Sequence, residues 1–390
     1  MLKFLYPKEY LPSVFQLTGK KLKALGKDTL IFDIDNTLVP YWIKTPTDEL
    51  RVYFNSLRES GIKIAVLSNS KEIRSKTFCE EMGIPYYGIS SGKLRRYFDP
   101  KNFSDPFRVL KGFHEAKKLL KKLKPDVVFS KGGFVTVPVV IAAKRCKIPA
   151  IIHESDMTPG LANKLCIPSA VKVCCNFPET VSSLPADKAV LTGTPIRQEL
   201  MKGNKEAGRQ FCGFTSDKPV LMVIGGSLGA ASVNDHIRKI LPELLKAFQV
   251  IHLCGKGKMD ETLKGTEGYV QYEYIKEELP DLFALSDVVI SRAGANAICE
   301  ISALHKPNLL IPLSANASRG DQILNARSFE KQGFSMVLEE EEITDEKLLD
   351  TIHQLYDNRH SFEEAMSAGK QMDSIHHIVS LIEECVLSKK

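Results

Sequence analysis

The feature that most constrains this chain is the regular alternation of short apolar segments with longer amphipathic ones. The apolar segments are rich in valine and isoleucine, as at residues 62–67, 126–130 and 219–224, and a helix-like stretch follows each of them. Strands that alternate with helices build parallel sheets, because each crossover helix returns the chain to the end of the sheet at which the previous strand began. We therefore predict an α/β protein made of two doubly wound, Rossmann-like domains that face a cleft.

Length and composition agree with a protein of this kind. The 390 residues are 43% hydrophobic and 26% charged, as in ordinary globular domains. A turn at residues 192–197 marks a boundary, so we expect domains at 1–190 and 191–365, with a final helix in 366–390 that packs back on the first domain. The nine cysteines lack metal-binding spacing. The N-terminus has no long apolar stretch, which favours a cytoplasmic protein.

Two glycine-containing turns each follow a predicted strand and precede a predicted helix. The first spans Gly225 to Gly229, and the second runs from Ser291 through Gly294. Glycine lets the backbone approach a ligand closely, and the free N–H groups of a helix start suit a phosphate. Glu300 lies about two turns into the second helix, where it could bind a ribose diol. The alternatives are two structural turns and an ordinary surface carboxylate.

Positive charge is concentrated between Ser91 and Lys124. This segment has eleven lysines and arginines against three acids, although the whole chain carries a net charge of only +6. Basic residues interleaved with aromatic ones are typical of a surface held against anionic lipid. A solvated helix face is the alternative. Nucleic acid is not expected, because no stacking or helix-turn-helix motif accompanies the charge.

From about residue 84 to residue 385, the chain resembles the MurG family of N-acetylglucosaminyltransferases. The resemblance is carried by both glycine-containing turns and by the following segments: residues 130–134 (SKGGF), 153–156 (HESD), 159–163 (PGLAN), 192–197 (TGTPIR) and 320–326 (GDQILNA). It implies a GT-B fold and transfer of N-acetylglucosamine from UDP-N-acetylglucosamine to an undecaprenyl-linked muramoyl lipid. It also implies a peripheral protein at the cytoplasmic face of the membrane.

The resemblance assigns roles to individual positions. On the donor side it implies binding by Arg197, Gly226, Ser227, Ile275, Ala295, Asn296, Ala297, Glu300 and Gln322. On the acceptor side it implies Gly132, Gly133, Asp156 and Asn163, with Asp156 standing where the family often has asparagine. Its membrane patch corresponds to Arg95, Arg96, Tyr97, Phe98, Phe103 and Phe107. The implied reaction is an inverting transfer that requires no metal, in which backbone N–H groups and helix dipoles meet the charge of the departing UDP.

The first 87 residues resemble a different family. The GGTxGH loop with which MurG-type enzymes begin is absent from the sequence, and the first strand instead runs into Asp33 and Asp35. With Ser68 after the second strand, these residues resemble small phosphatases of the haloacid-dehalogenase (HAD) class, of the YqeG-like group. That resemblance implies Asp33 as nucleophile, Asp35 as acid/base and Mg²⁺ at Asp33. The later lysine and acidic motif of such enzymes are missing.

Both families begin with strand–helix–strand units, so we expect the HAD-like segment to supply the first strands of one composite domain, with residues 88–190 as its acceptor and membrane side. Three functions follow. The first is the glycosyltransferase, with Asp33 or Asp35 as a hypothetical base in place of the missing loop. The second is a Mg²⁺-dependent phosphatase. The third is a UDP-sugar-binding protein without catalysis, or a product of recombination between two genes.

Overall fold

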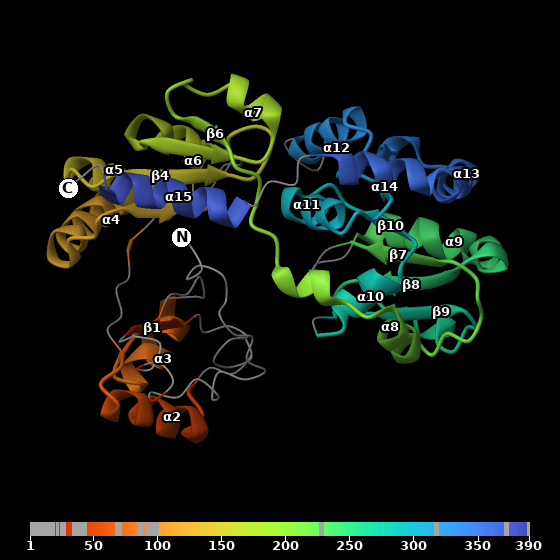
Figure 1. Cartoon of the computed structure of the whole chain (residues 1–390), viewed down its shortest axis with the longest axis horizontal. Helices are drawn as coiled ribbons and strands as arrows, with labels where there is room; N and C mark the ends of the chain where they lie inside the picture. Colours follow the sequence, from red (N-terminus) through yellow and green to blue (C-terminus); the bar gives the residue numbers. More distant parts are fainter. Residues whose placement is uncertain are drawn as a thin grey trace. The chain divides into compact units, whose positions relative to one another are not determined.

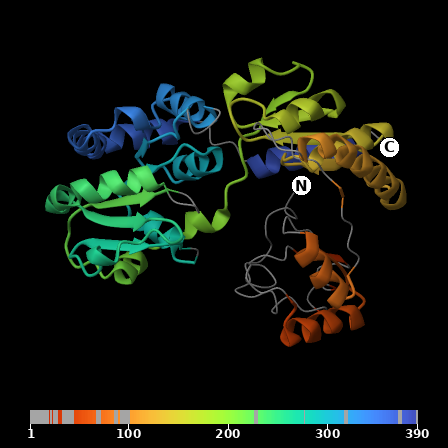
Figure 2. The ribbon, with the colours of Figure 1, turned by 180° about the vertical axis from the view of Figure 1, so that it is seen from behind.

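A computed structural model describes residues 20, 23, 29–32, 45–66, 72–84, 89–90, 101–225, 230–275, 277–315, 320–369 and 374–387. The chain divides into two compact units, Met1–Leu123 and Lys124–Lys390 (Figures 1 and 2). No helix in the described part of the chain is long and apolar enough to cross a membrane.

The first unit holds a small parallel sheet of its own. Its elements are β1 (Thr29–Phe32), α2 (Asp48–Glu59), β2 (Lys63–Val66), α3 (Glu72–Glu81) and α4 (Lys101–Leu123). The hydroxyl of Thr47 accepts a hydrogen bond from Leu50 N at 3.2 Å and caps α2. Phe54, Leu57 and Phe78, from α2 and α3, are fully buried.

β1 and β2 pair with each other in parallel, from Thr29 with Lys63 to Phe32 with Val66. α2 and α3 bring large apolar side chains of their own, so the segment buries its apolar faces locally. The composite N-terminal domain expected from the sequence stays a prediction.

The second unit begins with a four-stranded parallel sheet, which we name the first lobe together with its helices. Its strands, in sheet order, are β3 (Val128–Ser130), β4 (Ala150–Glu154), β5 (Lys172–Cys175) and β6 (Ala189–Leu191). The connecting elements are α5 (Thr136–Arg145), α6 (Leu161–Cys166), η2 (Ile167–Ser169) and α7 (Pro178–Ser182). The last helix, α15 (Ser374–Leu387), lies along this sheet in Figure 1, where Ile378 and Leu381 share a core cluster with Ile151 and Cys174.

The second lobe, residues 198–369, contains a six-stranded parallel sheet. Its strands are β7 (Val220–Ile224), β8 (Gln249–Leu253), β9 (Tyr269–Tyr272), β10 (Val288–Ser291), β11 (Asn308–Leu310) and β12 (Met336–Val337). Their order is β12-β11-β10-β7-β8-β9, so the direction of winding reverses between β7 and β10. The two-lobed α/β architecture expected from the sequence is confirmed.

Helices cover both faces of the second sheet. They are η3 (Gln198–Lys202), α8 (Lys205–Cys212), α9 (Ala231–Ala247), η4 (Glu261–Leu263), α10 (Leu279–Leu285), α11 (Ala295–Ala303), α12 (Asp321–Lys331), η5 (Glu340–Glu342), α13 (Asp345–Asp357) and α14 (Arg359–Ala368). Alternate residues of β7 point to opposite faces. Leu221 and Val223 accordingly pack with α9 and α13, whereas Val220 and Met222 pack with α8 and α10.

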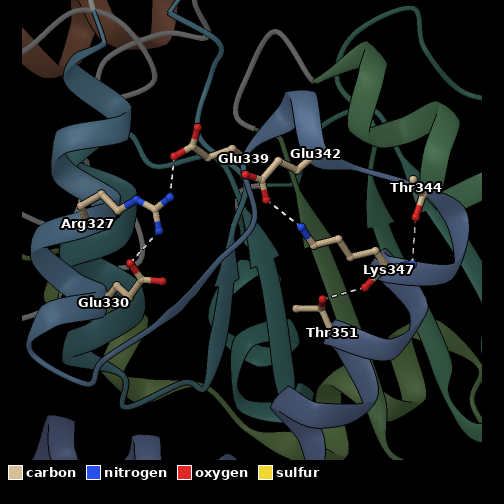
Figure 3. A network of polar contacts seen from close by, with 7 residues as sticks. All are labelled: Arg327, Glu330, Glu339, Glu342, Thr344, Lys347 and Thr351. Atoms are coloured by element: carbon tan, nitrogen blue, oxygen red, sulfur yellow. Dashed lines mark hydrogen bonds and ion pairs between the residues drawn. The ribbon is translucent and has the colours of Figure 1, made fainter.

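The acidic segment from Glu339 to Glu342 is held by basic side chains on both sides (Figure 3). Arg327 of α12 donates to the carboxylate of Glu339, and Lys347 Nζ donates to Glu342 Oε2 at 2.6 Å. Thr344 caps α13 by accepting from Lys347 N at 3.1 Å. The segment therefore forms an ordered connection between β12 and α13.

Candidate functional site

The strands that lead into the two glycine-containing turns are neighbours in the sheet of the second lobe. Ile224, the last residue of β7, pairs with Ser291, the last residue of β10. The strand order reverses between these strands, and open parallel sheets bind ligands beyond the carboxyl ends of their strands at such a switch point. Gly225 begins the first turn there, and residues 292–294 form the second.

The start of α11 faces open space. Gly294 precedes the helix in an extended conformation without a side-chain cap, and a Cβ added to it would meet nothing within 4 Å. Ala295 is buried, Asn296 is exposed and Ala297 is partly buried. The uncapped N–H groups and the positive end of the helix dipole make this turn suitable for an anionic ligand.

Arg197 and Glu300 form a bidentate pair beside this turn. Arg197 Nε donates to Glu300 Oε1 at 2.7 Å, and Nη2 donates to Oε2 at 2.8 Å. The hydrogen bonds that Arg197 donates to Glu300 raise the pKa of Arg197 above its ordinary value. Arg197 ends the segment that links the lobes, whereas Glu300 lies in the second turn of α11. The fold thus brings together two expected donor residues that are 103 positions apart.

The other expected donor residues lie on the same lobe. Gln322 is in the first turn of α12, and its Oε1 accepts a hydrogen bond from Leu313 N at 3.0 Å. Ile275 is partly buried against the core cluster that contains α10. Their contacts with a nucleotide stay a prediction.

Lys131 and His153 of the first lobe form hydrogen bonds with the segment that links the lobes, residues 192–197. His153 Nε2 lies 2.9 Å from the carbonyl oxygen of Gly193, which can only accept, so Nε2 carries the proton. Nδ1 then accepts from the ammonium of Lys131 at 3.3 Å, and Lys131 also donates to Thr194 Oγ1 at 3.2 Å. Burial, and then the charge of Lys131, lower the pKa of His153 to about 4. His153 is therefore neutral near pH 7.

Glu154 holds the expected acceptor loop, residues 155–160, through hydrogen bonds to its carboxylate. Its carboxylate is buried and accepts hydrogen bonds from Asp156 N and Gly160 N, each at 3.0 Å, and from Asn163 Nδ2 at 2.8 Å. Facing Asn163 is Gly132, where an added Cβ would approach the Asn163 amide to 3.4 Å. Both Gly132 and its neighbour Gly133 have positive φ values, at 96° and 89°, which L-residues rarely adopt. The four expected acceptor-side residues thus belong to one loop cluster.

Comparison with known proteins identifies the architecture. Residues 53–175 match the N-terminal domain of glycosyltransferase family 28, and residues 220–379 match its C-terminal domain. The UDP-N-acetylglucosamine--N-acetylmuramyl-(pentapeptide) pyrophosphoryl-undecaprenol N-acetylglucosamine transferase of Lachnoclostridium phytofermentans is 64% identical over 328 residues, which cover 84% of this chain and 92% of the relative. The transferase of the same name from Clostridium perfringens is 58% identical with the same coverage.

The chain belongs to the MurG family. It is accordingly a hexosyltransferase with the two-lobed GT-B fold. The crystal structure of Acinetobacter baumannii MurG superposes with a TM-score of 0.61 at 24% identity, covers 92% of this chain and 99% of its own, and supports the fold. The family match begins at residue 53, earlier than the start near residue 84 that we expected.

Several predicted residues lie outside the described part of the chain. These are Asp33, Asp35 and Ser68 of the HAD-like segment, Gly226 and Ser227 of the first turn, and Arg95, Arg96, Tyr97 and Phe98 of the membrane patch. Phe103 lies in α4, but its side chain is not described. Phe107, in the same helix, is 74% exposed. The HAD-like assignment and its Mg²⁺ therefore stay predictions.

Three contacts of the site were not anticipated. Arg292 forms a partly buried bidentate pair with Glu340, at 2.8 and 3.0 Å, which anchors the turn before α11. Lys131 donates to Thr194 of the linker, and Asn325 of α12 is fully buried against the first lobe. Local sequence patterns do not indicate these contacts, because the partner is more than 40 positions away in each case.

Proposed function

We propose that this chain transfers N-acetylglucosamine from UDP-N-acetylglucosamine to the undecaprenyl-diphospho-muramoylpentapeptide lipid of peptidoglycan synthesis. The relatives that carry this activity in their names are 57–64% identical over most of their length. The observation that carries the proposal is the switch point between β7 and β10, where the uncapped start of α11 lies beside the Arg197–Glu300 pair.

On the donor side, Glu300 binds the ribose of UDP and Arg197 binds its diphosphate. A carboxylate has about four acceptor positions, so Glu300 can accept from ribose hydroxyls while it holds Arg197. Arg197 has a side chain that is 47% exposed, and its remaining N–H donors suit phosphate oxygens. Ile275 and residues 295–297 line the pocket for the uracil base, and Gln322 contacts the N-acetylglucosamine of the donor.

In the reaction, a hydroxyl oxygen of the acceptor sugar attacks the anomeric carbon of N-acetylglucosamine from the face opposite UDP. The bond between that carbon and the diphosphate oxygen breaks, and its electron pair leaves with UDP. The N-terminal dipole of α11 and Arg197 stabilise the negative charge that develops there. The attacking hydroxyl releases its proton to a base, for which Asp33 or Asp35 stays the hypothesis. We propose that no metal is required, so excess EDTA should leave the rate of transfer unchanged.

The decisive experiment follows the release of UDP from UDP-N-acetylglucosamine in the presence of the lipid acceptor. The wild-type chain should turn over, and Glu300→Ala should raise the KM for the donor roughly ten- to a hundredfold, because charge-assisted hydrogen bonds contribute about 1.5–3 kcal/mol each. Glu330→Ala is the matched control, since it breaks an arginine–glutamate pair with Arg327 away from the switch point (Figure 3). Absence of wild-type turnover would refute the proposal.

We further propose that the chain works at the cytoplasmic face of the membrane, held against anionic lipid by α4. Phe107 and Leu110 of α4 are 74% and 57% exposed, and they lie next to Arg108 and Lys111. Residues three apart share a helix face, so the two apolar side chains can enter the lipid interface together. The acceptor is a lipid, so attachment to the membrane would bring the chain to its substrate.

A further inference from the structure

One buried side chain connects the two lobes at the site. Asn325 lies in α12 of the second lobe and is fully buried. Its Oδ1 accepts a hydrogen bond from Met157 N at 3.0 Å, and its Nδ2 donates to Asp156 Oδ1 at 3.3 Å. Nδ2 also donates to the carbonyl of Ala293 at 3.2 Å. A single amide therefore joins the acceptor loop of the first lobe to the turn before α11.

The neighbouring contacts hold the same loop against the same helix. Thr158 Oγ1 donates to Asp321 Oδ1 at 2.9 Å, next to Gln322 at the start of α12. Met157 packs on the apolar cluster that contains Phe177 of the first lobe and Phe329 of α12. The acceptor loop, residues 155–160, thus has both polar and apolar contacts with the helix that carries an expected donor residue.

The geometry requires an amide at position 325. The carboxylate of Asp156 and the carbonyl of Ala293 are acceptors, so the group that faces them must donate, whereas the other end must accept from Met157 N. A carboxylate at 325 would place an oxygen against two other oxygens in a buried position. Unpaired buried charge is strongly unfavourable, so the contact should be lost.

We propose that Asn325 is a positioning residue that couples donor binding in the second lobe to the arrangement of the acceptor loop, residues 155–160. Nucleotide binding orders the starts of α11 and α12. Asn325 connects these helix starts to the loop, because it forms hydrogen bonds with Ala293 on one side and with Met157 and Asp156 on the other. The acceptor is then positioned only when the donor is bound. This inference rests on the proposed function, because it assumes a UDP-sugar donor and a lipid acceptor. Its principal test requires only UDP.

The principal test is hydrogen–deuterium exchange of residues 155–160 with and without UDP. UDP should slow exchange in the wild-type loop severalfold, and Asn325→Asp should abolish this effect while calorimetry still detects UDP binding within about threefold of wild type. Adding Asp156→Asn to Asn325→Asp should restore part of the effect, because the amide at 156 can then donate to the carboxylate at 325, whereas the hydrogen bond to the Ala293 carbonyl stays lost. A merely structural role for Asn325 would not produce this reciprocal rescue.

Two further variants complete the test. Ser328→Ala is the matched control, because Ser328 of α12 donates a hydrogen bond to Glu179 of the first lobe, outside residues 155–160. This variant should show the UDP effect of the wild type. Thr158→Val is nearly isosteric, and it should weaken the UDP effect even if Asn325→Asp does not fold. A full UDP effect in Asn325→Asp, or in Thr158→Val if Asn325→Asp does not fold, would overturn the coupling.

Transfer kinetics separate this inference from the proposed function. If the chain is an active transferase, Asn325→Asp should raise the KM for the lipid acceptor and lower kcat about tenfold, with the KM for the donor changed less. If the wild-type chain shows no transfer, the proposed function fails, while the exchange experiment still decides whether UDP binding is coupled to the loop.

Discussion

At the scale of single residues, the buried histidines His153 and His252 have defined protonation states. His252 donates from Nε2 to Asn234 Oδ1 at 3.0 Å and accepts at Nδ1 from the Tyr269 hydroxyl, also at 3.0 Å. Asn234 Oδ1 is the acceptor because its amide nitrogen donates to Cys254 O. Burial lowers the pKa of His252 to about 3 and that of His153 to about 4. Both rings are therefore neutral in the folded protein at pH 5–7.

These pKa values predict how stability depends on pH. The unfolded chain begins to protonate both histidines near pH 6.5, whereas the folded chain protonates His153 only near pH 4. The stabilisation is thus complete above pH 6.5 and is lost as the pH falls toward 4. For His153 the stability lost should amount to about 1.4 kcal/mol at pH 5.5. We expect the thermal midpoint to fall between pH 7 and pH 5.5, and less steeply in His153→Gln.

The control for this measurement is His360→Gln. The His360 side chain is 69% exposed, so its replacement gives the slope that remains when a histidine outside the core is removed. An equal slope in His153→Gln and wild type would show that the buried ring does not contribute.

At the scale of elements, the first lobe depends on a helix from the far end of the chain. Ile378 and Leu381 of α15 are 5% and 8% exposed, and they share a core cluster with Ile151 of β4 and Cys174 of β5. Leu381→Ala should lower the free energy of unfolding by about 2–5 kcal/mol, the usual cost of truncating a buried leucine. Leu387→Ala, at the 67% exposed end of the same helix, should change it by less than about 0.5 kcal/mol. Urea denaturation checks both values, and equal losses would contradict the packing.

At the scale of the whole molecule, the uneven charge predicts a salt-dependent attachment to membranes. The wild-type chain should sediment with vesicles that contain anionic lipid, and less so as salt screens the basic residues of α4. Phe107→Ser with Leu110→Ser should reduce the bound fraction roughly tenfold, because two apolar side chains lose their transfer into the interface. Val52→Ser is the control, because Val52 is 70% exposed but lies in α2. Unchanged binding of the double variant would exclude α4 as the contact.

The sequence alone determined what local pattern controls. The alternation of apolar segments with helices specified the two-lobed α/β class, and the turns at Gly225 and Gly294 predicted a site, because both signals arise from neighbouring residues. The tertiary structure decided which distant groups meet. The Arg197–Glu300 pair and the Asn325 junction depend on the path of the chain between residues far apart. Periodicity does not encode that path. The burial of apolar faces determines the path, and polar partners then pair across the surfaces that burial brings together.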